Sequence, residues 1–231
     1  MADPIRKELT PSILTADYGH LADELKMLED GGVKWLHLDV MDGMFVPNIT
    51  FGMPLIRDLR KISSLFFDVH LMIEEPERYI EAFADAGSDL ITVHIEAVKD
   101  AKAAIDRIHA AGKWAGLSLR PGTDLQTVIP YLPELEMLLV MSVEPGFGGQ
   151  SYIPASTDRI RALDAIRKKE GLSFHIGVDG GINPKTIETA LAAGADNPIG
   201  GSCVFSGTRE EKRAKLCAIQ EIMRKWNGGE A

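Results

Sequence analysis

Short apolar segments alternate with longer segments of helical period along nearly the whole chain. In the helical segments apolar residues recur every three or four positions, as at Leu21, Leu25 and Leu28, which is the pattern of a helix with one buried face. Glycines such as Gly87 and Gly194 follow these segments and can adopt the left-handed conformation that ends a helix. The predicted strands cover residues 11–14, 35–40, 66–71, 90–94, 115–119, 137–143, 174–179 and 197–200.

Eight strands that alternate with helices predict an α/β fold with parallel strands, because each connection is long enough to form a right-handed helical crossover. Within 231 residues, this arrangement favours a single (β/α)8 TIM barrel over an open, doubly wound sheet. No linker or charge block interrupts the alternation, so we expect one domain over residues 1–231. The dinucleotide-binding form of the open sheet also requires a Gly-x-Gly-x-x-Gly motif after an early strand, and the sequence has none there.

The composition argues against several classes of partner. The chain has 34 Asp and Glu against 25 Lys and Arg, for a formal net charge of −9, which disfavours a nucleic-acid partner bound through its phosphates. No apolar stretch approaches the roughly 20 residues of a membrane span, and the first residues lack the apolar segment of a signal peptide. We therefore expect a cytoplasmic protein with no membrane partner. Cys203 and Cys217 fit neither a zinc motif nor a disulfide framework, which favours reduced thiols.

Polar side chains lie at the carboxyl ends of three predicted strands, where barrel enzymes place their active sites. Residues alternate between the two faces of a strand, so His37 and Asp39 point into the barrel while the apolar residues around them face the helices. His70 lies at the end of the third strand and Asp179 at the end of the seventh. The sequence therefore predicts that these four side chains meet at one end of the barrel.

The chemistry of these four residues favours a metal site. His37 and Asp39 alone suit a metal site and a buried hydrogen bond about equally, but two imidazoles with two carboxylates favour one divalent transition-metal ion. Zn²⁺, Fe²⁺, Mn²⁺ and Co²⁺ all accept such donors, so the identity of the ion stays open. His94 also ends a strand, but as a single further histidine it is expected to support the site or the barrel without binding the metal.

Glycine-rich turns follow the last three strands, at residues 144–150, 180–181 and 201–202. Without side chains, the backbone N–H groups of such turns can approach an anion closely. Barrel enzymes often bind a phosphate after strands seven and eight. One Gly-Gly pair is explained equally well by a tight turn, but three such turns on neighbouring strands predict a small-molecule substrate that carries a phosphate. No Gly-Lys-Ser/Thr signature is present, which argues against a nucleotide as phosphate donor.

Several sequence blocks closely resemble the ribulose-phosphate 3-epimerase family, over nearly the whole chain from Pro11 to Phe205. The blocks are Pro-Ser-Ile-Leu (11–14), His-Leu-Asp-Val-Met-Asp-Gly (37–43), Phe-Val-Pro-Asn-Ile-Thr-Phe-Gly (45–52), Asp-Val-His-Leu-Met (68–72), Met-Ser-Val-Glu-Pro-Gly-Phe-Gly-Gly-Gln (141–150) and Val-Asp-Gly-Gly-Ile (178–182). The resemblance implies a TIM barrel of the ribulose-phosphate-binding type. It also implies an isomerase of the pentose phosphate pathway that interconverts D-ribulose 5-phosphate and D-xylulose 5-phosphate.

The resemblance also implies roles for individual residues. His37, Asp39, His70 and Asp179 are the implied ligands of one divalent metal ion per subunit, with no cofactor beyond it. Asp39 and Asp179 are the implied acid/base pair, with Asp39 the usual proton acceptor and Asp179 the donor. A homo-oligomer is implied as well, either a dimer or a hexamer. The residues expected to bind the substrate are Ser12, His70, Gly146, Phe147, Gly148, Gly149, Asp179, Gly180, Gly181, Gly201 and Ser202.

Four positions depart from the family pattern. Met44 replaces the usual His, and Gly177 replaces the usual Glu. Loss of an inward Glu at position 177 is expected to alter the side chains that orient Asp179. Asn197 and Pro198 interrupt the apolar eighth strand, and because proline has no backbone N–H, we expect this strand to be distorted.

Three other functions remain open at this point. An epimerase of a related ketose phosphate, such as D-allulose 6-phosphate, would use the same four ligands. A catalytically inactive sugar-phosphate-binding barrel would not require the carboxylate pair Asp39 and Asp179. A phosphate-binding lyase or synthase barrel would normally place a catalytic Lys inside a strand, and none is evident here.

Overall fold

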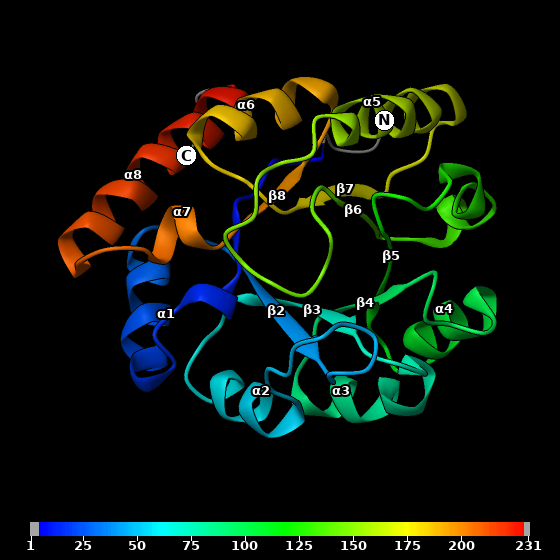
Figure 1. Cartoon of the computed structure of the whole chain (residues 1–231), viewed down its shortest axis with the longest axis horizontal. Helices are drawn as coiled ribbons and strands as arrows, with labels where there is room; N and C mark the ends of the chain where they lie inside the picture. Colours follow the sequence, from blue (N-terminus) through cyan, green and yellow to red (C-terminus); the bar gives the residue numbers. More distant parts are fainter. Residues whose placement is uncertain (1–4, 229–231) are drawn as a thin grey trace.

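A barrel of eight parallel strands surrounded by helices is the central feature of the computed structural model, which describes residues 5–228 (Figure 1). The strand order around the sheet is β1-β8-β7-β6-β5-β4-β3-β2. A parallel bridge between Ser12 and His37 closes the ring between β1 and β2. The predicted (β/α)8 barrel is thereby confirmed. The strands are Thr10–Pro11 (β1), Trp35–Met41 (β2), Phe66–Met72 (β3), Leu90–His94 (β4), Trp114–Leu119 (β5), Met137–Met141 (β6), His175–Asp179 (β7) and Asn197–Gly200 (β8).

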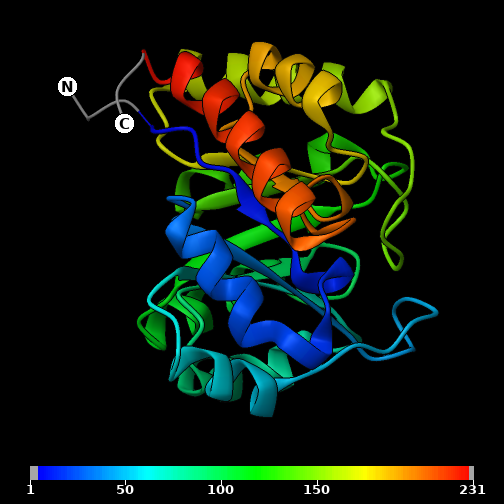
Figure 2. The same ribbon diagram turned by 90° about the vertical axis from the view of Figure 1, so that its left-hand side faces the viewer.

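The helices lie outside the strands and pack their apolar faces on the sheet (Figures 1 and 2). The first helix, for example, buries Leu21, Leu25 and Leu28, whose spacing predicts it. The helices are Leu21–Asp30 (α1), Met53–Arg60 (α2), Ile80–Ala86 (α3), Ala101–Ala110 (α4), Ala155–Glu170 (α5), Pro184–Ala193 (α6), Ser202–Phe205 (α7) and Arg209–Trp226 (α8).

The connection between β5 and β6 differs from the expected helix. It consists of two 3₁₀ segments, Leu125–Thr127 and Ile129–Glu134. Pro130 and Pro133 lie in the second segment, and proline cannot donate the backbone hydrogen bonds that a continuing α-helix requires. The composition of this connection therefore explains why its helix is replaced by turns.

The first predicted strand is shorter than its apolar run. β1 contains only Thr10–Pro11, and Ile13–Thr15 forms a 3₁₀ turn in place of the strand expected over 11–14. The hydroxyl of Ser12 caps this turn by accepting a hydrogen bond from the N–H of Leu14 at 3.1 Å.

The eighth strand keeps its hydrogen-bonded neighbours in spite of Pro198. β8 pairs in parallel with both β1 and β7.

Alternation along each strand separates the outer core from the barrel interior. On β2, Leu36, Leu38 and Val40 are buried against the helices, while His37 and Asp39 point inward. Aromatic side chains close the interior at the amino-terminal end of the strands, with ring centroids 4.2–6.0 Å apart. They are Trp35, Phe66, Trp114 and His175. The polar residues of the interior are thus directed to the carboxyl ends of the strands.

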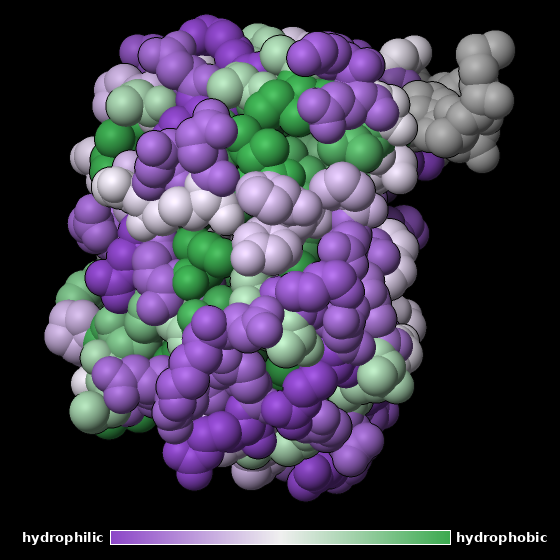
Figure 3. Space-filling view, turned by 90° about the vertical axis from the view of Figure 1, so that its right-hand side faces the viewer, coloured by the Kyte–Doolittle hydropathy of each residue, from purple (hydrophilic) through white to green (hydrophobic). Residues whose placement is uncertain are grey.

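The surface between these elements is mixed in polarity. Figure 3 shows one side of the molecule, where hydrophilic side chains predominate in the lower half and apolar areas are smaller. Within residues 5–228, no helix has both the length and the apolar character needed to cross a membrane. Cys203 and Cys217 are free thiols.

Candidate metal centre and active site

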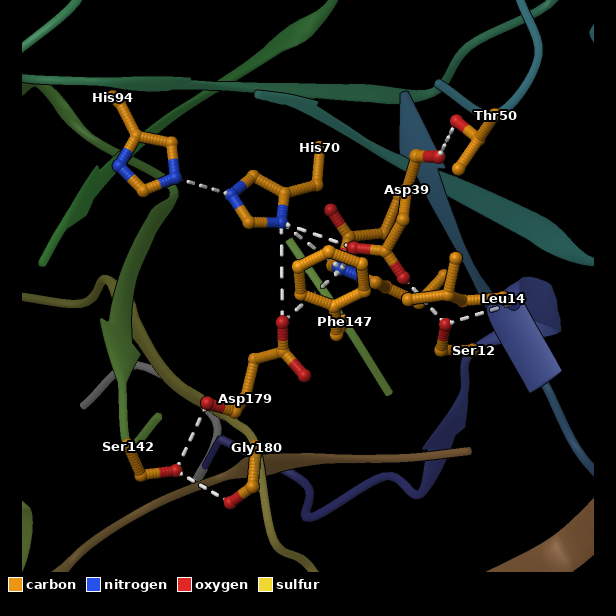
Figure 4. A network of polar contacts seen from close by, with 12 residues as sticks. Ser12, Leu14, Asp39, Thr50, His70, His94, Ser142, Phe147, Asp179 and Gly180 are labelled. Atoms are coloured by element: carbon orange, nitrogen blue, oxygen red, sulfur yellow. Dashed lines mark hydrogen bonds and ion pairs between the residues drawn. The ribbon is translucent and has the colours of Figure 1, made fainter. Parts of the chain in front are cut away.

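The four side chains predicted as metal ligands converge at the carboxyl end of the barrel. Figure 4 shows three of them, Asp39, His70 and Asp179, directed toward one another. His37 and Asp39 come from β2, His70 from β3 and Asp179 from β7, and one donor atom of each lies within 4.8 Å of the others. Nε2 of His37 and Nδ1 of His70 are 3.3 Å apart. Each of these nitrogens is 3.3 Å from Oδ1 of Asp39 and 4.0 Å from Oδ2 of Asp179. The sequence therefore identified a real cluster of donors.

These separations fit a single divalent ion. A tetrahedral ion with bonds of about 2.0–2.2 Å holds its ligand atoms about 3.3–3.6 Å apart, which matches the distances among His37, Asp39 and His70. Two nitrogen and two carboxylate donors also suit a transition metal. The side chain of Asp179 is 17% exposed, whereas the other three are buried. Asp179 is thus the donor most open to a substrate.

Hydrogen bonds hold the two β2 donors in place. Nδ1 of His37 lies 2.7 Å from Oδ2 of Asp68, a partnership common among metal-binding histidines because it directs the other ring nitrogen to the ion. Ser12 Oγ donates to Oδ2 of Asp39 at 2.5 Å, and Thr50 Oγ1 donates to the backbone carbonyl of Asp39 at 2.6 Å. Oδ1 of Asp39 is therefore the oxygen that faces the two histidines.

The two catalytic candidates differ in how readily they hold a proton. Burial raises the pKa of Asp39, but the charge and hydrogen bonds of His37 and His70 outweigh it and hold that pKa below its usual range. Burial and the negative charge of Asp39 raise the pKa of Asp179 to about 7. Burial lowers the pKa of His37, yet the charges of Asp39 and Asp68 raise it well above its usual value. A divalent cation would supply the positive charge that the proton on His37 otherwise provides.

His94 lies behind His70 and outside the cluster of four donors. Its Nε2 atom is 2.9 Å from Nε2 of His70, and the two rings stack with centroids 4.9 Å apart. Its Nδ1 atom is 3.1 Å from Oε2 of Glu96. Burial lowers the pKa of His94 to about 4, so the ring is neutral.

Asp68 and Glu96, the two carboxylates that support the histidines, are not among the site residues predicted from the sequence. Asp68 precedes His70 by two residues, and Glu96 follows His94 by two residues. Because side chains two apart share a face of a strand, the same alternation that identified the histidines also indicates Asp68. Glu96 lies just beyond β4, where this pattern is weaker.

A cavity of about 550 Å³, its open mouth included, lies over the donors. Asp39 and Asp179 line it, and so do Met41, Met72 and Met141. Apolar walls with a few converging polar groups are typical of a site for a small molecule. The other predicted substrate-binding residues that line it are Ser12, Gly146, Phe147, Gly148, Gly149, Gly180, Gly181, Gly201 and Ser202. His70 is fully buried and does not line the cavity, so its contact with the sugar stays a prediction.

The three glycine-rich turns meet at one side of this cavity. Gly181 has a φ of +66°, and a Cβ there would lie 2.2 Å from the backbone nitrogen of Tyr152. A Cβ at Gly201 would lie 2.8 Å from Oγ1 of Thr15. The close packing excludes side chains and leaves backbone groups to face the cavity, as anion sites require. Phe147, which is 54% exposed, lies in front of the donor cluster in Figure 4.

The structure shows how the interior accommodates Gly177. A Cβ at this position would lie 2.9 Å from both Cδ1 of Leu139 and Sδ of Met137. Apolar side chains therefore occupy the space beside Gly177, and no room is left for a larger inward side chain without repacking. Met44, the other departure from the family pattern, is 69% exposed.

The turn that carries Asp179 is instead held through its backbone. Ser142 Oγ is within hydrogen-bond distance of two carbonyls, that of Asp179 at 2.9 Å and that of Gly180 at 2.7 Å. The N–H of Ser142 donates to the carbonyl of Asp179 at 2.8 Å. The end of β6 thus fixes the position from which the Asp179 side chain reaches the cavity.

Comparison with known proteins gives one consistent family. The model of the ribulose-phosphate 3 epimerase family matches residues 8–205, a range that contains all four donors. A ribulose-phosphate 3-epimerase of Treponema pallidum (strain Nichols) is 46% identical over 209 residues, covering 90% of this chain and 94% of that protein. The protein of the same name from Bacillus subtilis (strain 168) is 42% identical over 216 residues, covering 93% and 97%. A cytoplasmic isoform from Oryza sativa subsp. japonica is 43% identical over 209 residues, covering 89% and 90%.

Solved structures share the barrel at much lower identity. KGPDC from Streptococcus mutans has a TM-score of 0.69 and 12% identity, with 96% of this chain and 99% of that chain covered. A structure described as native KDPGal has a TM-score of 0.67 and 16% identity, with 98% of each chain covered. At these identities the likeness concerns the fold alone.

Proposed function

The chain belongs to the ribulose-phosphate 3-epimerase family, and from this premise we propose that Asp39 and Asp179 invert C3 of D-ribulose 5-phosphate to give D-xylulose 5-phosphate. The protein is an isomerase, and a role in the pentose phosphate pathway is consistent with the names of its relatives. One observation carries the assignment of the residues: two carboxylates, Asp39 from β2 and Asp179 from β7, line the same cavity, and their surroundings shift their pKa values in opposite directions. Such pairs mark the acid and the base of a site.

Inversion of a carbon next to a carbonyl requires removal of its proton from one face and delivery of a proton to the other. We assign removal to Asp39, which is buried beside the two histidines, and delivery to Asp179, the more exposed carboxyl of the cluster, whose pKa burial and the charge of Asp39 raise. The C3–H electrons pass into an enediolate, and the proton from Asp179 then forms the new C3–H bond. Asp39 ends protonated and Asp179 ionised, so exchange with solvent restores the starting state. The reverse reaction exchanges the two roles.

The donor set indicates a metal-dependent enzyme, with one divalent ion per subunit held by His37, Asp39, His70 and Asp179. When bound there, such an ion would supply positive charge that stabilises the negative charge of the enediolate. Zn²⁺, Fe²⁺, Mn²⁺ and Co²⁺ are the candidates, because nitrogen and carboxylate donors accept each of them. Ser12 keeps Asp39 oriented through its hydrogen bond to Oδ2.

We assign the phosphate of the substrate to the glycine-rich side of the cavity, formed by Gly146 to Gly149, Gly180, Gly181, Gly201 and Ser202. Binding of this remote group orients C3 between the two carboxylates. The apolar side chains of Met41, Met72 and Met141 line the cavity and would limit the access of water to the enediolate.

Gly181→Val tests the phosphate assignment. The added side chain collides with the backbone at Tyr152, so kcat/KM for D-ribulose 5-phosphate should fall roughly a hundredfold, as expected for a misplaced substrate. Metal content should be unchanged. Gly201→Val should act in the same way, whereas Gly52→Val, at a glycine with open space around it, serves as the control. Equal turnover of D-ribulose and D-ribulose 5-phosphate by the unaltered protein would show that the turns have only a structural role.

The preferred substrate is tested by comparing five- and six-carbon ketose phosphates in one assay. We expect kcat/KM for D-ribulose 5-phosphate to exceed that for D-allulose 6-phosphate. The reverse order would assign the protein to the related epimerase activity.

We further propose that residues 1–231 act as a single catalytic domain, in a cytoplasmic homo-oligomer, dimer or hexamer, without a nucleic-acid or membrane partner. Analytical ultracentrifugation tests the oligomeric state.

A further inference from the structure

The two histidine donors are supported in different ways. His37 has a carboxylate, Asp68, as its direct partner at 2.7 Å. His70 has a second histidine, His94, at 2.9 Å, and only beyond it a carboxylate, Glu96, at 3.1 Å. His70 and His94 are both fully buried. A carboxylate therefore contacts His37 directly, whereas a neutral histidine ring lies between His70 and its carboxylate.

The directions of these hydrogen bonds follow from the atoms that face one another. Nδ1 of His70 points to the donor cluster, and a metal ligand must present an unprotonated nitrogen. The proton of neutral His70 is therefore on Nε2, which donates to Nε2 of His94. His94 then carries its own proton on Nδ1 and donates it to Oε2 of Glu96. One arrangement of protons satisfies all three groups.

The far end of this connection is anchored at the barrel rim. Oε1 of Glu96 accepts hydrogen bonds from the backbone N–H of Arg120, at 2.8 Å, and from the hydroxyl of Thr123. Phe45 packs on the ring of His94 with centroids 4.8 Å apart, and the guanidinium of Arg120 lies over Phe45 at 4.2 Å. Contacts from the loops after β2 and β5 thus hold the His94 ring and its acceptor in one orientation.

We propose that His94 is a positioning residue which, together with Glu96, fixes the tautomer and orientation of His70 as a metal ligand. The inference rests on the metal site of the proposed function and adds two residues outside its four donors. A partner behind a metal-binding histidine typically contributes 10- to 100-fold to metal affinity or activity. His94 does not line the substrate cavity, so its effect should appear in metal binding before it appears in KM.

The test is titration of the metal-free full-length protein with Co²⁺ and Zn²⁺. Co²⁺ reports the ligand geometry through its visible absorption, and Zn²⁺ affinity is measured by competition with a chromogenic chelator. His94→Phe keeps a flat ring but removes the acceptor, so it should bind both ions roughly 10- to 100-fold more weakly and alter the Co²⁺ spectrum. His94→Gln retains a side-chain carbonyl as acceptor and should recover most of the affinity. His175→Phe, at the opposite end of the barrel, is the matched control and should bind as the unaltered protein does.

Glu96→Gln provides a second route if circular dichroism shows that His94→Phe is unfolded. It keeps the shape of a partly exposed side chain but removes the charge, and Zn²⁺ affinity should fall several-fold. The decisive variant is His94→Phe if it folds, and Glu96→Gln if it does not. If that variant binds both ions within twofold of the unaltered protein and gives the same Co²⁺ spectrum, the positioning role is overturned while the metal site stays intact. Failure of the unaltered protein to bind either ion would overturn the metal site itself and this inference with it.

Discussion

Asp179→Asn is expected to form D-xylulose 5-phosphate from D-ribulose 5-phosphate roughly 10²- to 10⁴-fold more slowly than the unaltered protein, the range typical for loss of a general acid or base. Asn has nearly the same shape but cannot deliver a proton to C3. Asp39 remains in place on β2, so the variant should still exchange the C3 proton of D-ribulose 5-phosphate with solvent. Proton NMR in D₂O separates this exchange from formation of the epimer.

Asp39→Asn should show the opposite preference. It should exchange the C3 proton of D-xylulose 5-phosphate through Asp179 and epimerise either substrate poorly. Both residues are also proposed ligands, so metal content must be measured for each variant. Asp58→Asn, which changes an exposed carboxylate on α2, is the control. Epimerisation at the unaltered rate by both metal-loaded variants would exclude the two-carboxylate assignment.

Removal of the metal should have an effect of similar size. Dialysis against a chelator is expected to lower epimerase activity at least about a hundredfold, because positive charge at the site contributes several kcal/mol to stabilisation of the enediolate. Addition of one equivalent per subunit of Zn²⁺, Fe²⁺, Mn²⁺ or Co²⁺ should restore it, with a rate that depends on the ion.

The same titration should raise the melting temperature, since an ion that binds only the folded state stabilises it. A variant that lacks two donors, His37→Ala with His70→Ala, should show neither response. Full epimerase activity in protein shown by elemental analysis to be free of metal would contradict the metal-dependent account.

The positions of the four donors could be predicted from sequence because two simple rules suffice. Residues two apart on a strand share a face, which places His37 with Asp39, and the carboxyl ends of parallel strands meet at one rim, which brings His70 and Asp179 to them. The structure pairs Asp39 with His70 in register on β2 and β3, so the rule led to a real contact.

The hydrogen-bond partners that support the two histidine donors could not be predicted in the same way. His37 meets Asp68 because these two residues are register partners on neighbouring strands, and a single sequence does not reveal register. His94 reaches His70 only through the ring orientations of both residues. The support of a ligand depends on such cross-strand geometry, whereas the ligand itself is identified by its chemical type and its place on the strand.

One strand prediction and one helix prediction were wrong because of local side chains. An apolar run predicts a strand over 11–14, but the Ser12 hydroxyl caps a 3₁₀ turn there and its hydrogen turns to Asp39. The β5–β6 connection contains Pro130 and Pro133 and forms 3₁₀ segments. The first exception places the Ser12 hydroxyl beside Asp39, the carboxylate that we propose as the base.

The central claim is that C3 loses its proton to one carboxylate and receives another from the second. It is tested most directly by letting the metal-loaded, unaltered protein convert D-ribulose 5-phosphate in D₂O and analysing the first D-xylulose 5-phosphate formed by proton NMR and mass spectrometry. We predict one deuterium at C3 of the product from the earliest turnovers, because Asp179 is equilibrated with solvent before it delivers its proton. Product that retains the original hydrogen at C3, under conditions that exclude its internal return, would contradict the two-carboxylate mechanism.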